Sequence, residues 1–90
     1  MLVTDVDEAG AAKTREDVVR AGGRGTVRRC DVRSAEEVAA LVDAGEKDLG
    51  GVDLAINNAG VAVAGNVGDV SLEDWKWQID INLWGVIHGC

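Results

Sequence analysis

Three short apolar runs alternate with three amphipathic segments along the 90 residues, and this alternation predicts an α/β layered fold with a parallel sheet. The length allows one domain, and a chain of this size buries only about 60% of the surface that it exposes when unfolded. The composition, 47% hydrophobic and 28% charged, is typical of a globular protein. The chain has no repeats or linkers, so we expect no second domain within residues 1–90.

The first half contains two expected strands and the helix between them. The β-branched run 2–6 predicts a buried strand, and the segment 7–21 predicts a helix. Gly22 and Gly23 end this helix, because glycine commonly follows the last helical residue. Residues 26–32 form the second expected strand.

Two serine caps mark the remaining helices. Ser34 with Glu37 fits a capping box, which predicts a helix over 35–49 that Gly50 ends. The run 52–56 is the third expected strand. Ser71 begins the last helix, which we expect to continue to residue 90.

The last helix has two apolar stripes on opposite faces, and we expect both to be covered. One consists of Trp75, Ile79, Asn82 and Val86, and the other of Trp77, Ile81, Trp84 and His88. Asn82 is polar and must find a hydrogen-bond partner, which a neighbouring backbone segment would satisfy. His88 fits an interface or core position better than a metal ligand.

Charge and composition exclude several functions. The formal charge of -7 argues against nucleic-acid and membrane partners, and seven of the nine basic residues, within 13–33, form an expected solvated face. No tyrosine is present, so no phenol in this chain serves as acid or base. No metal-ligand spacing occurs. Two distant cysteines and the lack of a leader or an apolar span favour reduced thiols in a cytoplasmic protein.

The expected strand ends carry polar residues that allow two interpretations. Asp5 could accept hydrogen bonds from ribose hydroxyls and repel a 2′-phosphate, or complement the dipole of the following helix. Asp31 and Val32 could contact an adenine ring, although for Asp31 taken by itself a turn before the next helix is the simpler explanation. The run 57–60, Asn-Asn-Ala-Gly, could form a plain turn or approach a ligand at the carboxyl end of a parallel strand.

Four motifs occur in a specific order. They are Thr-Asp-Val-Asp at 4–7, Arg-Cys-Asp-Val at 29–32, Leu-Gly-Gly-Val-Asp-Leu-Ala-Ile-Asn-Asn-Ala-Gly at 49–60 and Asp-Ile-Asn-Leu-Trp-Gly at 80–85. Each is common alone, but the ordered set resembles the classical short-chain dehydrogenase/reductases. The resemblance covers essentially the whole chain and implies a partial Rossmann-like, doubly wound parallel sheet, with residues 1–90 as a partial dinucleotide-binding domain.

The resemblance also implies roles for individual residues. The residues expected to bind NAD are Asp5, Val6, Asp31, Val32, Asn58, Ala59 and Gly60. Asp5 favours NAD over NADP. Asn82 matches the asparagine of the family's catalytic set, whose backbone holds a water in the proton relay. Family members commonly associate through the equivalent of 71–90, so a homo-oligomer is implied.

The chain departs from the family in three motifs. It contains no glycine-rich TGxxxGxG turn, no catalytic serine and no YxxxK segment. We therefore expect an internal part of an NAD-dependent oxidoreductase that acts on an alcohol or ketone, inactive by itself and lacking the family's first strand and carboxyl-terminal half. The alternative is a small non-catalytic α/β module that binds a nucleotide or a protein.

Overall fold

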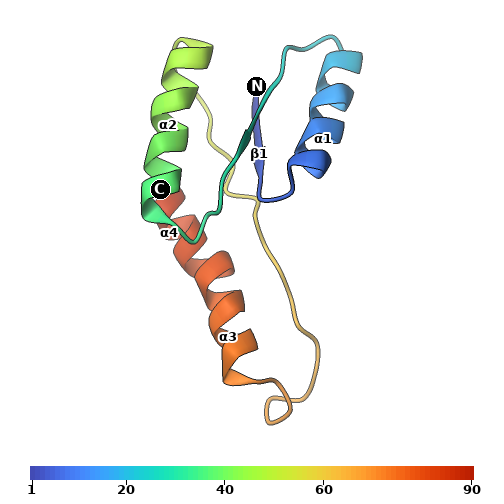
Figure 1. Ribbon diagram of the computed structural model, residues 1–90, viewed down its shortest axis with the longest axis vertical. Coiled ribbons are helices and arrows are strands. Elements are labelled where there is room, and N and C mark those ends of the chain that lie inside the picture. The colour runs from blue at the N-terminus through green and yellow to red at the C-terminus, as the bar shows by residue number, and fades with distance from the viewer.

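The computed structural model describes residues 1–90, in which two strands and two helices form one end of the molecule and a third helical segment extends away from them (Figure 1). The elements are β1 (Leu2–Asp5), α1 (Glu8–Arg20), β2 (Thr26–Arg29), α2 (Ala35–Leu49), α3 (Leu72–Ile79), the π-helical turn η1 (Asp80–Trp84) and α4 (Gly85–Gly89). The α/β class predicted from the alternating pattern is confirmed.

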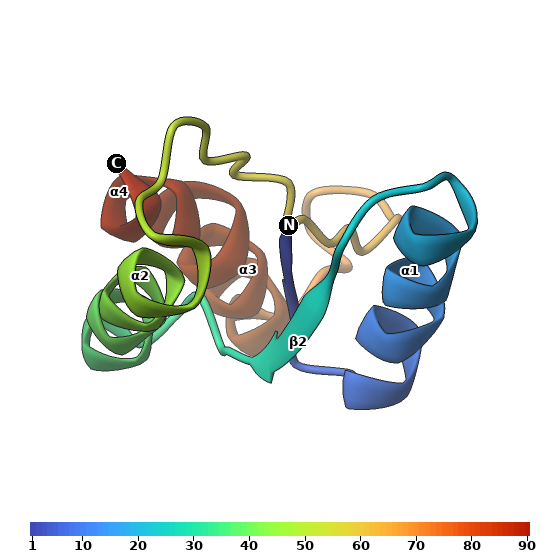
Figure 2. The ribbon, with the colours of Figure 1, turned by 90° about the horizontal axis from the view of Figure 1, so that it is seen from above.

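The sheet has two parallel strands. β1 and β2 pair with Leu2 opposite Thr26 and Asp5 opposite Arg29, and they lie between α1 and α2 (Figure 2). Both strands are shorter than the sequence predicts. β2 ends at Arg29 because the chain turns soon afterwards, where the Asp31 amide donates to the Glu37 carboxylate.

The prediction of a third strand over 52–56 is wrong. The only backbone hydrogen bond in this segment joins the Asn58 amide to the Ile56 carbonyl over 3.1 Å. An apolar run becomes a strand only when another strand pairs with its backbone, and the sheet contains β1 and β2 alone. Leu54 and Ile56 are consequently 77% and 71% exposed.

Local capping explains where the helices begin and end. The Ser34 and Ser71 hydroxyls accept from the amides of Glu37 and Asp74, as predicted. Gly50 ends α2 in the left-handed region, with φ of 75°. The capping box is only half formed, because the Glu37 carboxylate bonds to Asp31 rather than to Ser34.

The last helix is interrupted where the sequence predicts a continuous one. It runs as α-helix to Ile79, widens into a π turn over 80–84, and resumes at Gly85. A π turn inside an α-helix is rare and is found frequently at functional sites. Here it contains Asn82.

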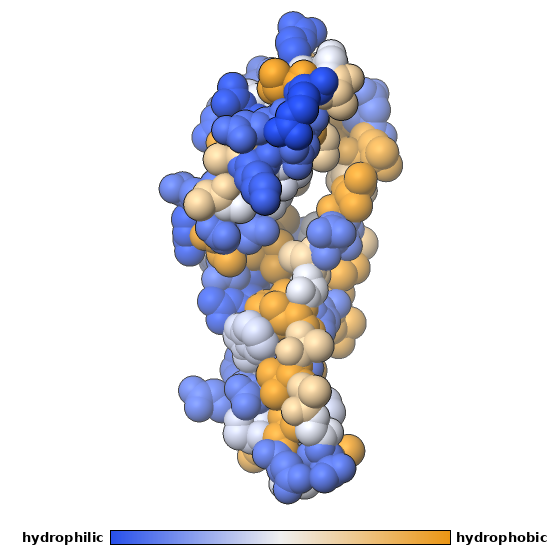
Figure 3. All heavy atoms as spheres, turned by 90° about the vertical axis from the view of Figure 1, so that its right-hand side faces the viewer, coloured by the Kyte–Doolittle hydropathy of each residue, from blue (hydrophilic) through white to orange (hydrophobic).

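The core is small for a chain of this length. Four apolar residues are buried, namely Val3, Ala11, Cys30 and Val38. The molecule measures 47 × 26 × 18 Å, and apolar side chains lie among polar ones along the length of one face (Figure 3). No helix combines the length and the apolar character needed to cross a membrane.

Candidate functional site

The pairing of β1 with β2 brings two of the predicted site residues to one edge of the sheet. Asp5 is the last residue of β1, and its carbonyl accepts from the Cys30 amide over 3.2 Å, one residue before Asp31. One oxygen of the Asp5 carboxylate accepts from the Asp7 amide at 3.0 Å. Its other oxygen has no partner in the chain, and Val6 beside it is 52% exposed.

Nearly all of the backbone polar groups in the turn from residue 31 to 34 make hydrogen bonds, and these hold the turn in place. The Asp31 amide donates to Glu37 over 2.6 Å, and the Asp31 carbonyl accepts from the Ser34 amide over 3.0 Å. The Arg33 amide donates to the Asp31 carboxylate over 3.0 Å. The Val32 amide alone among the backbone donors of this turn has no partner within the chain.

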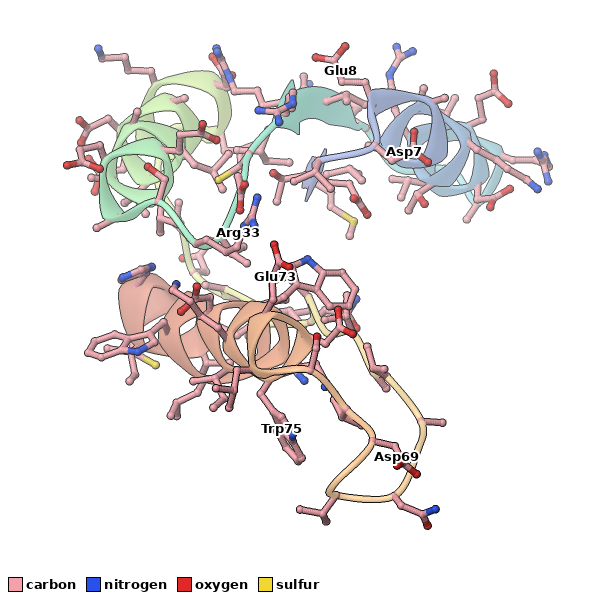
Figure 4. All side chains as sticks on the ribbon, turned by 60° about the horizontal axis from the view of Figure 1, so that its bottom comes forward. Asp7, Glu8, Arg33, Asp69, Glu73 and Trp75 are labelled. Carbon is pink, nitrogen blue, oxygen red and sulfur yellow. The ribbon has the colours of Figure 1, made fainter.

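Arg33 holds the Asp31 carboxylate with its guanidinium as well. Its Nε lies 3.0 and 3.1 Å from the two carboxylate oxygens, and Nη2 lies 2.6 Å from Oδ2. These hydrogen bonds hold the pKa of Asp31 below its usual value and raise the pKa of Arg33. Asp31 is therefore an oriented carboxylate whose acceptor positions are largely taken by Arg33, which Figure 4 shows between the strands and the last helix.

Cys30 lies directly before this turn and is buried. Burial, followed by the negative charges of Glu37 and Asp31, raises the pKa of the Cys30 thiol. A neutral buried thiol is a weak nucleophile. Cys30 accordingly serves the core beneath the turn rather than the chemistry of the site.

The segment 57–60 is exposed throughout and reaches the last helix at residues 82 and 89. The Asn57 side chain occupies the position where a Cβ at Gly89 would stand. Gly60 lies beside Asn82, since a Cβ at Gly60 would be 3.5 Å from the Asn82 Oδ1. The Asn58 backbone amide donates to the Ile56 carbonyl, whereas its side-chain carboxamide makes no hydrogen bond and is free for a ligand.

Asn82 has the backbone partner that its position on an apolar stripe predicts. Its Oδ1 accepts from the Val61 amide over 2.8 Å, and its Nδ2 donates to the Val61 carbonyl over 2.7 Å. Gln78, one turn earlier on the helix, accepts from the Val63 amide over 3.0 Å. Two helix side chains thus provide the backbone of 61–63 with the hydrogen bonds that a neighbouring strand would supply.

Three further residues position the site, and the sequence interpretation did not assign them this role. They are Gln78, Gly85 and His88. His88 Nδ1 lies 2.8 Å from the Val32 carbonyl, and a Cβ at Gly85 would lie 2.7 Å from Val32 Cγ2. The spacing of four residues between Gln78 and Asn82 places them on one helix face and could have indicated Gln78. Nothing in the sequence indicated that Gly85 and His88 contact the turn.

Two of the segments that carry predicted site residues contact the last helix. Val32 contacts it at Gly85 and His88, and the segment 57–61 contacts it at Asn82 and Gly89. Asp5 lies opposite Arg29 on the neighbouring strand, two residues before Asp31. Carboxyl ends of parallel strands are where α/β proteins bind ligands.

Comparisons with known proteins place this arrangement in a family. The family model described as enoyl-(acyl carrier protein) reductase matches residues 1–90. The chain belongs to the short-chain dehydrogenase/reductase family. A 3beta-hydroxysteroid dehydrogenase 1 from Eggerthella lenta is 44% identical over 84 residues, covering 93% of this chain and 32% of the relative.

Solved structures of the family share the fold of this chain. A short-chain dehydrogenase/reductase from Burkholderia phymatum in complex with NAD superposes with a TM-score of 0.90 at 39% identity, covering 98% of this chain and 31% of that one. A gluconate 5-dehydrogenase from Burkholderia cenocepacia, in complex with NADP and tartrate, has a TM-score of 0.83 at 26% identity, covering 98% and 34%. The chain thus spans about a third of the length of these short-chain dehydrogenases/reductases.

Proposed function

We propose that this chain supplies the adenosine-binding part of an NAD site within a longer short-chain oxidoreductase that passes hydride between nicotinamide and a small alcohol or ketone. The observation that carries the proposal is the pair of carboxylates, Asp5 and Asp31, at the ends of two hydrogen-bonded parallel strands. A cytoplasmic location fits the two free cysteines.

The polar groups of the site fit an adenosine. Asp5 has a carboxylate oxygen free to accept from ribose hydroxyls, and the partnerless Val32 amide can donate to a ring nitrogen of adenine. Arg33 already holds the Asp31 carboxylate, so we assign Asp31 mainly to the shape of the turn and secondarily to the adenine amino group. Val6, with Asn58, Ala59 and Gly60, would line the nucleotide.

The carboxylate of Asp5 favours NAD over NADP. A 2′-phosphate beside an ionised carboxylate would meet like-charge repulsion, whereas two ribose hydroxyls donate to it. Among the structural neighbours, one holds NAD and another NADP.

Asn82 is the residue of this chain that we assign to catalysis. Its side chain is committed to Val61, which leaves its backbone carbonyl, within the π turn, as the group that would hold a water. Bound nicotinamide would supply the hydride chemistry. The 90 residues contain no tyrosine to act as general acid. We therefore expect no turnover by this chain alone.

The sheet supports a place within a larger domain. One edge of β1 is unpaired, and the extended segment 52–56 has no strand beside it although its apolar side chains are largely exposed. A further parallel strand between these two segments would pair both. We infer that the longer protein provides it, together with the diphosphate-binding turn and the general acid. We also propose that the longer protein forms oligomers through residues 71–90.

Ligand titrations of the 90-residue chain test the adenosine site. We expect adenosine 5′-monophosphate to shift the amide resonances of Asp5 and Val32 in NMR spectra, at millimolar concentration because no diphosphate cradle is present. Adenosine 2′,5′-bisphosphate should bind more weakly, and Asp5→Asn should remove that difference. Chemical-shift changes at other residues, with none at Asp5 or Val32, would contradict the proposal.

An activity assay tests the expected lack of turnover. Purified chain with NAD and simple secondary alcohols should give no increase in absorbance at the wavelength where NADH absorbs. Clear NADH production, removed by Asn82→Ala, would show that this chain is an active enzyme and would overturn this part of the proposal.

A small non-catalytic binding module is the second candidate, and one observation favours it. Both helices of the unit from β1 to α2 have a side-chain N-cap, and no buried side-chain nitrogen or oxygen lacks a hydrogen-bond partner. A cooperative thermal melt by circular dichroism, together with compact elution on size exclusion, would favour the module. Aggregation or a broad, non-cooperative melt would favour a part of a larger domain.

A further inference from the structure

The Val32 peptide groups are held from the far end of the chain. His88 Nδ1 lies 2.8 Å from the Val32 carbonyl, across 56 residues of sequence. A carbonyl oxygen only accepts, so Nδ1 must carry the proton. The Val32 side chain packs over Gly85, where any Cβ would come within 2.7 Å of it. One helical segment therefore fixes both the carbonyl and the side chain of Val32.

This contact completes the fixation of the turn. The amides of Asp31, Arg33 and Ser34 all have partners within 31–37. The His88 bond adds the Val32 carbonyl to the fixed groups and leaves the Val32 amide as the free backbone donor. Because its neighbouring groups are held, the Val32 amide has one orientation before a ligand arrives. Binding therefore costs little further conformational entropy at this amide.

We propose that His88 is a positioning residue for purine recognition: by holding the Val32 carbonyl it fixes the backbone at the Val32 Cα, and so the place from which the free Val32 amide, in the preceding peptide, donates to an acceptor nitrogen at the edge of adenine. The inference rests on the proposed adenosine site and adds a residue that determines specificity. His88 acts through Val32 and does not itself contact the ligand.

The same helix connects the two halves of the site. Asn82, Gly85 and His88 follow one another at intervals of three residues, and Asn82 holds Val61 while His88 and Gly85 hold Val32. The Trp84 and His88 rings are neighbours, with centroids 6.1 Å apart. A change at His88 should consequently affect the Asp31 turn and leave the Asn82 contact in place.

Two nucleotides distinguish a positioning role from a general structural one. Adenosine 5′-monophosphate presents an acceptor at ring position N1, whereas inosine 5′-monophosphate carries a hydrogen there and cannot accept from the Val32 amide. The wild-type chain should therefore prefer the adenine nucleotide. His88→Phe keeps a ring against Trp84 and removes the donor to Val32.

We expect His88→Phe to weaken binding of the adenine nucleotide about fivefold, the loss of roughly one hydrogen bond, with little change for the inosine nucleotide. His88→Gln can still donate from its amide and should restore most of the preference. Equal losses for both nucleotides, or an unchanged preference in His88→Phe, would overturn the positioning role while leaving the adenosine site intact. A wild-type chain that binds neither nucleotide would overturn the proposed function and this inference with it.

A measurement on the wild-type chain needs no variant. Nitrogen-15 NMR of the imidazole distinguishes the two neutral tautomers, and the hydrogen bond to Val32 requires the proton on Nδ1. Observation of the Nε2–H tautomer as the main neutral form would contradict the proposal even if His88→Phe failed to fold.

Discussion

At the scale of single residues, Asp31 and Arg33 form the strongest electrostatic contact of the candidate site. Three guanidinium contacts of 2.6 to 3.1 Å and one backbone bond hold the carboxylate. Arg33 is 46% exposed and the Asp31 side chain only 18%. Solvent therefore screens the arginine more than the carboxylate, and the contribution to stability is modest.

The depressed pKa of Asp31 gives a stability difference that depends on pH. A carboxylate whose pKa is lower in the folded than in the unfolded state stabilises the fold above the unfolded value, about 3.9, and loses that contribution as pH falls through the folded pKa. We expect Asp31→Asn to destabilise the chain by about 1 kcal/mol at pH 7. The difference should shrink in urea unfolding experiments as pH falls below the unfolded value and the carboxylate becomes protonated in the folded state as well.

Asp17→Asn is the matched control for this prediction. Asp17 pairs with Arg20 on the surface of α1, where both side chains are more than half exposed. Exposed ion pairs contribute little, so this variant should differ from wild type by a few tenths of a kcal/mol at any pH. A loss at Asp31 that is independent of pH would contradict the role assigned to its ionised form.

Asn82 gives a second prediction at this scale, because its two hydrogen bonds can be removed separately. Asn82→Asp keeps an acceptor for the Val61 amide and loses the donor to the Val61 carbonyl, while Asn82→Ala loses both. The Val61 amide should therefore exchange with deuterium much faster in Asn82→Ala than in Asn82→Asp. Similar protection in both variants would show that another group holds Val61.

At the scale of elements, the caps were predictable from sequence and the partners were not. Ser34 and Ser71 cap their helices as expected because a cap depends on residues only three positions away. The run 52–56 has the composition of a strand, but pairing requires a neighbour that composition cannot supply. The sequence showed that Asn82 needs a partner, and the fold alone identifies it as Val61.

Because α4 packs closely against the turn at 31–34, we expect a glycine-to-alanine substitution there to destabilise the chain, which is opposite to the usual effect. Replacing a helical glycine by alanine ordinarily stabilises by about 1 kcal/mol. At Gly85 the new Cβ would lie 2.7 Å from Val32 Cγ2 and 3.1 Å from its Cβ, so the turn must shift. We expect Gly85→Ala to lower the midpoint of urea unfolding.

Gly45→Ala is the control, since Gly45 is also helical and buried. Its new Cβ would meet only side-chain methyl groups, at 3.3 Å from Val52 and 3.5 Å from Leu2. These groups can move aside, and the variant should be neutral or more stable than wild type. A stabilising Gly85→Ala would show that the contact with Val32 is looser than the structure gives.

At the scale of the whole molecule, the chain is expanded for its length. Its radius of gyration is 14.9 Å, whereas a compact domain of this length has one of about 12 Å. Six of the 90 residues are buried, and sixteen large apolar side chains are exposed. Exposed apolar surface of this extent is typical of surfaces that contact other protein segments or ligands, which supports the proposed place within a longer protein.

The last helix offers the most specific of these surfaces for a test of self-association. Trp84 is 50% exposed, and Leu83 and Ile87 beside it are 55% and 49% exposed. A charge buried in an apolar interface costs far more than the same charge in water. We therefore expect Trp84→Glu to shift the chain towards monomer in sedimentation velocity runs over a range of concentrations. Leu54→Glu, in the unpaired segment 52–56, tests the alternative that chains associate by pairing their exposed strand edges. If Leu54→Glu disperses the oligomers and Trp84→Glu leaves them unchanged, association runs through the open sheet rather than through the helix.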